Sequence, residues 1–206
     1  MKEKPFETIN YRGFKIECYY DTDSESPNDW GDEEQFLVYD HRDFTITRKY
    51  FEPQEIFERM QNGFKLFPND EFWFFPVYAY IHSGVSLSLS RRVYPFNDRW
   101  DVSFKGFALI KRQKRTWTED AAYKAAQSLI DTWNEYLSGE VYGYVSEVHS
   151  CWNYYGDEGL KQMIAEAKNE IDHHILLERK NHFAYLKKMI KNHVPIDIRK
   201  KLEFVN

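Results

Sequence analysis

The sequence lacks a run of apolar residues long enough to cross a membrane, which takes about 18–20 consecutive residues. Its first residues are charged and have no apolar stretch behind them, so we expect no secretory signal there. It has only two cysteines, Cys18 and Cys151, and neither shows the CxxC or Cys/His spacing of a zinc site. We therefore expect a cytoplasmic protein with reduced thiols and no membrane partner.

Aromatic residues are abundant: they make up 18% of the 206 residues, while all hydrophobic residues make up 42%. A chain of this length buries a sizeable core without disulfides or metals. We predict a compact α+β domain over residues 1–172. Residues 173–206 are expected to form a C-terminal helical extension of the same domain.

Charge is spread unevenly along the chain, although the net charge is only −5. Residues 21–34 hold seven acids and no base, whereas residues 90–115 hold eight bases and two acids. The stretch 179–201 is again basic. Such asymmetry favours faces with different partners, although a charged run is also typical of a solvated surface.

Hydrophobic periodicity and turn residues predict the secondary structure. Gly106 in the middle of a strand indicates a bulge or a close backbone approach. Thr118 is expected to cap a helix that ends at Gly139, and Pro195 is expected to stop a long helix. The predicted strands span 12–20, 35–41, 43–48, 72–90 (as a hairpin turning at 83–84), 101–111 and 140–149. The predicted helices span 53–63, 118–138, about 157–192 and 196–203.

Most strands come early in the chain and the longest helices come late. This order predicts an α+β fold with a mainly antiparallel sheet, helices packed on one face of it and a long C-terminal helix.

The acidic run 21–34 follows a predicted strand and is the first candidate site. Its alternating acids suggest calcium, but an EF-hand loop needs Gly where Ser26 stands and a helix on each side. We prefer a solvated loop, or a loop that presents carboxylates like a row of phosphates to a nucleic-acid-binding surface. The candidate binding residues are Asp21, Asp23, Glu25, Asp29, Asp32, Glu33 and Glu34.

The octet 150–157 joins a predicted strand to the long helix and contains three large aromatic residues, Trp152, Tyr154 and Tyr155. They either lock the helix onto the sheet or form an aromatic binding patch, and large aromatics more often serve packing.

The basic stretch 91–117, with its interleaved aromatics, is the best candidate for binding nucleic acid. The overall acidity of the chain opposes affinity for a phosphate backbone. The residues concerned are Arg91, Arg92, Arg112, Lys114, Arg115 and Trp117.

A nucleophile–base set can be assembled from His82, Asp101 and Cys151, but no surrounding motif supports a hydrolase. His173 and His174 lack the HExxH spacing of a zinc enzyme. We therefore predict no catalytic residue, no metal and no cofactor, and we favour a protein that is not an enzyme.

Five blocks occur in order along the chain: YYDTDSESPNDW, IHSGVSLSLS, RWDVSFKGFALI, YLSGEVYGYVSE and SCWNYYGDEGLKQMIAEAKNEID. Between about residue 12 and residue 172, this pattern resembles a group of accessory proteins of bacteriophages and other mobile elements. The resemblance implies action in the cytoplasm of a bacterial host. By analogy with other accessory proteins of that context, it implies binding to a host defence complex.

The predicted function is therefore binding and inhibition of a host defence or nuclease complex, of the anti-CRISPR or anti-restriction type. The expected partner is a host protein or nucleoprotein complex. The alternatives are a nucleic-acid-binding accessory protein that uses residues 91–117 and, less favoured, a hydrolase. A homodimer through the C-terminal helix is a further option, because that helix carries an apolar stripe.

Overall fold

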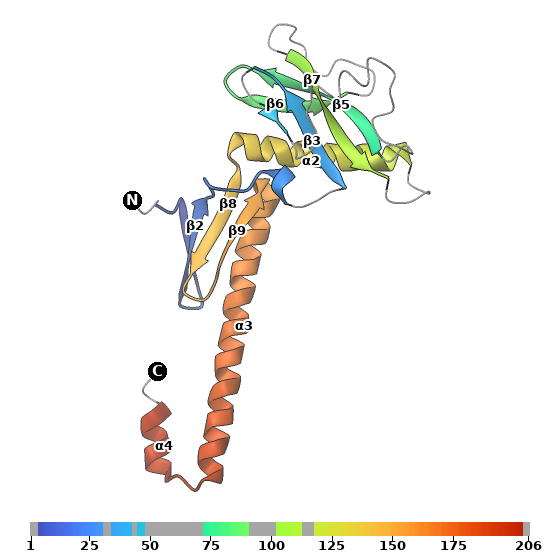
Figure 1. Ribbon diagram of the computed structural model, residues 1–206. Helices are drawn as coiled ribbons and strands as arrows, with labels where there is room; N and C mark the ends of the chain where they lie inside the picture. The colour runs from blue at the N-terminus through green and yellow to red at the C-terminus, as the bar shows by residue number, and fades with distance from the viewer. Residues whose placement is uncertain are drawn as a thin grey trace.

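The computed structural model describes residues 4–30, 34–42, 45–47, 72–90, 102–112 and 118–203. The described strands form two antiparallel sheets (Figure 1). The four-stranded sheet has the order β1 (Glu7–Tyr11), β2 (Phe14–Tyr20), β8 (Val141–Ser146), β9 (Ser150–Tyr155). The five-stranded sheet has the order β4 (Thr45–Ile46), β3 (Gln35–Asp40), β7 (Val102–Lys111), β5 (Phe72–Ile81), β6 (Val85–Leu89).

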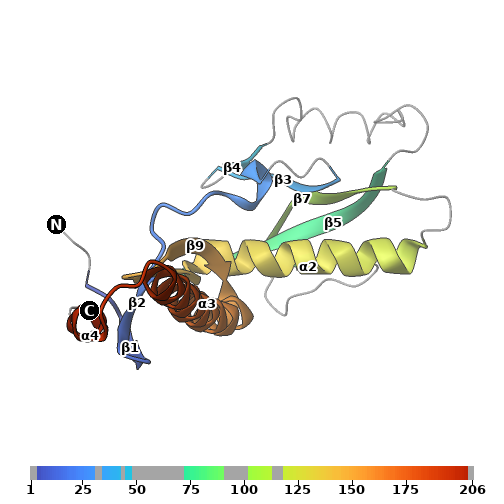
Figure 2. The same ribbon diagram turned by 90° about the horizontal axis from the view of Figure 1, so that it is seen from below.

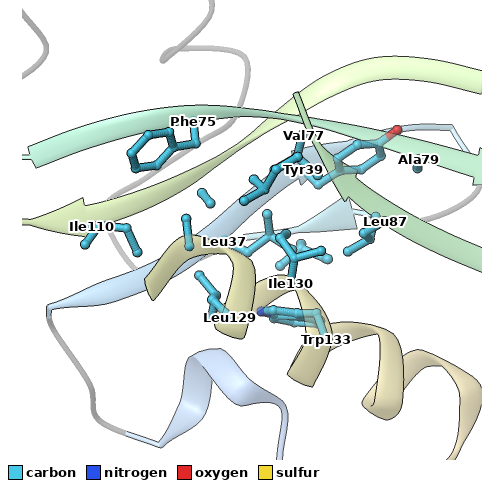
Figure 3. Close-up of a cluster of buried hydrophobic side chains, with 14 of the residues drawn as sticks. Leu37, Tyr39, Phe75, Val77, Ala79, Leu87, Ile110, Leu129, Ile130 and Trp133 are labelled. Atoms are coloured by element: carbon cyan, nitrogen blue, oxygen red, sulfur yellow. The ribbon is translucent and has the colours of Figure 1, made fainter. Parts of the chain in front are cut away.

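Helix α2 (Glu119–Ser138) lies across one face of the five-stranded sheet (Figure 2). Its buried residues Leu129, Ile130 and Trp133 pack against strand residues such as Leu37 and Val77 (Figure 3). The spacing of three and four residues places these side chains on one stripe of the helix. This cluster is the larger of the two cores that join a helix to a sheet.

The ends of α2 follow from capping residues. The Thr118 hydroxyl accepts a hydrogen bond from the Ala121 amide at 3.3 Å. Gly139 has φ +76°, which costs glycine little and lets its amide bond the last carbonyls of the helix. The sequence prediction for this helix is confirmed at both ends.

Gly106 lies where β7 passes close to β3. A Cβ atom at this position would overlap the Tyr39 ring and would lie 2.8 Å from the Val38 carbonyl oxygen. The register between β5 and β7 shifts beside it, between Val77 and Tyr78. Both features that the sequence suggested for this glycine, a bulge and a close backbone approach, are therefore present.

Helix α3 (Gly156–Lys191) covers one face of the four-stranded sheet with its first half. Met163, Ala167 and Ile171 are fully buried against strand residues that include Ile16 and Tyr144. The helix continues far beyond the end of the sheet, and after Pro195 helix α4 (Ile196–Glu203) runs back beside it (Figure 1). The long helix and the last short helix match their predicted spans closely.

The α+β prediction is confirmed, including the long C-terminal helix. The strands are distributed over two sheets, each with its own helix, and strands β1 and β9 were not predicted. The predicted helix 53–63 lies outside the described residues. The division into residues 1–172 and 173–206 stays a prediction, and α3 runs through that boundary without a break. No helix in the described part of the chain has the length and apolarity needed to span a membrane.

Candidate functional site

The acidic loop connects the two sheets, since it leaves β2 at Tyr20 and enters β3 at Gln35. Asp23, Glu25, Asp29 and Glu34 are exposed, and Asp21 is half-buried. The other two predicted acids, Asp32 and Glu33, lie outside the described residues. The hydroxyl of Ser26 accepts the Asn28 amide at 3.3 Å and so caps the short 3-10 helix η1 (Pro27–Asp29).

Strand β9 holds this loop at three points, Asp21, Glu25 and Trp30. The Asn153 amide donates to the Asp21 carboxylate at 3.2 Å, and the Tyr155 hydroxyl donates to the Glu25 carbonyl at 2.7 Å. The Trp30 ring packs edge-on against the Tyr155 ring, with centroids 4.9 Å apart. The loop is therefore a fixed surface over residues 21–30.

Asn28 fixes the middle of the same loop to the five-stranded sheet. Its side-chain amide donates to the Leu37 carbonyl at 2.8 Å and its carbonyl accepts the Leu37 amide at 3.1 Å. In the described part of the chain, the printed pairs of β4 are with Tyr39 and Asp40. The buried Asn28 side chain satisfies both backbone groups of Leu37.

The predicted aromatic patch divides into two environments. Tyr154 is buried in the core under α3, whereas the Trp152 side chain is 41% exposed. The two residues would share a face of a regular strand. A bulge separates them, because Trp152 and Asn153 together oppose Gly143, and Asn153 has φ +66°.

Gly143 gives Trp152 its place on the outer face of the sheet. A Cβ atom at Gly143 would overlap the indole ring. The indole reaches across β8 and lies beside Tyr19 of β2, with ring centroids 6.1 Å apart. Trp152 is therefore held flat against the sheet while part of its ring faces solvent.

The structure thus joins two of the predicted sites, the acidic loop and the aromatic residues of β9. We call this the loop–tryptophan surface and define it by its exposed members: Asp23, Glu25, Asp29, Trp30 and Trp152. Burial raises the pKa of Tyr155 to about 12, and the Asp21 and Glu25 carboxylates act in the same direction. Tyr155 therefore stays protonated as the donor that holds the loop. Trp30, Asn28 and Asn153 were missing from the sequence prediction.

Of the residues predicted for the third site, in the basic stretch, only Arg112 is described. The Arg112 guanidinium lies over the Trp73 ring, 3.9 Å from its centroid, so this cation is packed on β5. Arg91, Arg92, Lys114, Arg115 and Trp117 lie outside the described residues. Nucleic-acid binding by this stretch stays a prediction.

The candidate hydrolase residues belong to different parts of the fold. His82 lies in the turn between β5 and β6 of the five-stranded sheet, while Cys151 lies on β9 of the other sheet. Asp101 is outside the described residues. Cys18 is buried, and burial raises the pKa of its thiol to about 11, so it is a poor nucleophile at neutral pH.

The two histidines of α3 differ in their surroundings. His174 packs edge-on against Phe14 and lies 3.4 Å from the Glu178 carboxylate, and His173 is exposed. Within the described ranges, no group of three or more His, Cys, Asp or Glu side chains is arranged to hold a metal ion.

Glu135 lies where α2 ends and α3 begins. A Cβ atom on Gly156, which has φ +64°, would overlap its carboxylate. Burial raises the pKa of Glu135, and the negative charges of Asp131, Glu140 and Asp157 add to the effect. The folded state thus favours the protonated form of this carboxyl group more than the unfolded state does.

We expect Glu135→Gln to raise the free energy of unfolding at neutral pH. When folding raises the pKa of a carboxyl group, the free energy of unfolding falls as pH rises above the pKa of the unfolded state. The fall is complete once the pH exceeds the pKa of the folded state. The gain from Gln should therefore disappear in acid, where Glu135 is also neutral. Urea denaturation of both proteins from acid to neutral pH measures this difference. Equal stability at every pH would contradict the assignment.

Comparison of the chain with protein-family models, with curated proteins and with solved structures finds no match.

Proposed function

We propose that this protein binds and inhibits a host defence or nuclease complex by covering a basic, nucleic-acid-binding surface of that complex. The contact would be the loop–tryptophan surface. The observation that carries the proposal is the anchoring of the acidic loop by Asn153, Tyr155 and Asn28, which presents its carboxylates on a fixed backbone.

Fixed carboxylates suit a cationic partner for two reasons. Complementary charge speeds the encounter and rejects partners of the wrong sign. A loop that is already ordered spends little conformational entropy on binding. Asp23, Glu25 and Asp29 supply three exposed acids within seven residues, without a base among them.

The two tryptophans supply the apolar part of the same contact. Trp30 is 46% exposed and Trp152 is 41% exposed, and each is held by a neighbouring ring. Exposed tryptophans of fixed orientation are common centres of binding energy in protein interfaces, and indole also packs on Arg or Lys. The surface therefore matches a patch that is both basic and partly apolar.

The bacteriophage context comes from the sequence resemblance, and it suggests where such a patch occurs. Restriction and CRISPR nucleases hold nucleic acid in basic grooves, which a row of carboxylates can occupy in place of phosphates. The proposal therefore treats the protein as a competitor of the nucleic acid for these grooves.

The test is a phage plaque assay in bacterial strains that each carry one restriction or CRISPR system. The wild-type chain should restore plaques in at least one strain. The triple variant Asp23→Asn, Glu25→Gln, Asp29→Asn should lose this protection, because losing three charges should weaken binding about 10- to 100-fold. Circular dichroism of the purified variant checks that it is folded.

The matched control removes three exposed carboxylates elsewhere, through Glu119→Gln, Glu147→Gln and Glu178→Gln. It changes the net charge equally and should keep full protection. The proposal fails if the wild-type chain protects no strain, or if both triple variants behave alike.

A further inference from the structure

The distal half of α3 and helix α4 form an arm that leaves the body of the protein (Figure 1). We define the arm as residues 176–203. Large apolar side chains on it are exposed, up to 64% for Phe183 and 66% for Ile196. They are Leu176, Leu177, Phe183, Tyr185, Ile190, Ile196 and Ile198. A group of this size on one arm marks a surface that is covered in use.

The spacing of these residues indicates what covers them. Leu176, Phe183 and Ile190 are each seven residues apart, the repeat with which one helix packs along another. Leu177 and Tyr185 lie on other sides of the same helix, at about 100° of rotation per residue. A helix that is apolar on several sides is buried by several neighbouring helices in a bundle, whereas docking on a flat surface would bury only one of its sides.

Charge along α3 is segregated in the same place. Residues 156–178 contain six acids and two bases, whereas residues 179–191 contain five bases and no acid. Residues 179–206 carry eight Lys or Arg against two acids, which is a net charge of +6. Because the whole chain has a net charge of −5, residues 1–178 together have a net charge of −11. Each chain therefore offers both halves of a complementary pair.

We infer that the arm docks on a second copy of this chain, with the two α3 helices antiparallel. This arrangement places the basic half of each α3 beside the acidic half of the other. A parallel pair would place like charges together along the whole helix. Helix α4 of each copy runs back beside the distal half of its own α3 and adds a further helix to the bundle (Figure 1).

Other occupants fit these observations less well. A nucleic acid would satisfy the bases but would leave the apolar residues on several sides in water. An anionic membrane surface needs the apolar and basic residues on opposite faces. On the distal half of α3 they share faces, because Lys187 and Lys188 follow Leu176 and Leu177 by eleven residues, which is about 20° around the helix.

The first test is the mass of the full-length protein by analytical ultracentrifugation. We expect 49.8 kDa, twice the chain mass of 24.9 kDa. Phe183→Glu should raise the dissociation constant at least about tenfold, since it places a charge in the seam of both copies. Phe183 is exposed in the single chain, so this change should leave the fold intact. Ser128→Glu adds the same charge at an exposed position of α2, away from the arm, so it is the control and should stay dimeric.

The second test is a charge exchange that reports orientation. Lys180→Glu with Lys187→Glu should weaken the dimer, as should Glu158→Lys with Glu170→Lys. Mixing the two variants should restore association as a heterodimer. Spin labels placed along α3 should give a distance between copies that grows by about 3 Å per residue from the middle of the contact, because each helix rises about 1.5 Å per residue.

Three results would overturn the inference. The first is a monomer of 24.9 kDa at all protein concentrations, with or without an oligonucleotide bound to the arm. The second is a dimer that Phe183→Glu does not weaken. The third is a label distance that stays constant along α3, which belongs to a parallel pair.

Discussion

Replacing Asn28 with alanine is expected to lower the free energy of unfolding by about 2–5 kcal/mol, because two buried backbone groups lose their partners together. Those groups are the amide and the carbonyl of Leu37, which Asn28 bonds at 3.1 Å and 2.8 Å. Leu37 is fully buried, so water does not replace the lost hydrogen bonds. The same change releases the middle of the acidic loop, so protection in the plaque assay should fall with stability.

Urea denaturation followed by circular dichroism measures this effect. Asn10→Ala removes an exposed asparagine from β1 and serves as the control, which should stay within about 0.5 kcal/mol of the wild type. A loss below about 1 kcal/mol for Asn28→Ala would show that Leu37 finds other partners, and the account of the loop would then be wrong.

Replacing Trp133 with alanine is expected to cost about 3–5 kcal/mol, the usual range for removing a buried tryptophan. Trp133 is 3% exposed and lies between α2 and the five-stranded sheet, with its ring edge-on to Tyr136 at 5.6 Å (Figure 3). Its removal leaves a cavity between α2 and the sheet.

Trp133→Phe separates the apolar packing from the polar indole group. Within the described residues the buried indole N–H has no hydrogen-bond partner, so phenylalanine loses volume but no hydrogen bond. We expect the phenylalanine variant to lose less than half as much stability as the alanine variant in thermal and urea unfolding. Equal losses in the two variants would place the contribution of Trp133 elsewhere than in packing.

The helices of this protein were predictable because their signals are local. Thr118 and Gly139 mark the ends of α2, and Pro195 follows the end of α3 within four residues. The apolar stripe of α3 through Met163 and Ile171 has the helical period. The hairpin of β5 and β6 was equally clear, because Ser83 and Gly84 interrupt two runs of aromatic and β-branched residues.

The division into two sheets was not predictable in this way. Strand β2 pairs with β8, so Cys18 faces Tyr144 across more than a hundred residues of sequence. Strand β9 escaped notice because its bulge at Asn153 breaks the alternation that marks a strand. Strand β1 was missed because only Ile9 and Tyr11 of its residues are partly buried in the core.

The charges of the candidate site were predictable from the sequence, but the fixed conformation of its loop was not. The carboxylates of the loop are visible in the sequence, and the Ser26–Pro27 pair indicates a turn. Nothing local shows that Asn153 and Tyr155, more than 120 residues away, would hold that loop. These hydrogen bonds from β9 hold the acids in place as a surface, and they form only when the two distant segments come together in the folded chain.

The central claim, that the loop–tryptophan surface contacts a basic partner, is tested most directly by photo-crosslinking in bacterial cells. A benzoyl-phenylalanine placed at Trp30 or Trp152 should crosslink to a nuclease or another nucleic-acid-processing protein, at a peptide rich in Lys and Arg. The same group at Phe104, an exposed ring of the five-stranded sheet, should not. Crosslinks from Phe104 but not from either tryptophan, or crosslinks to peptides without basic residues, would contradict the account.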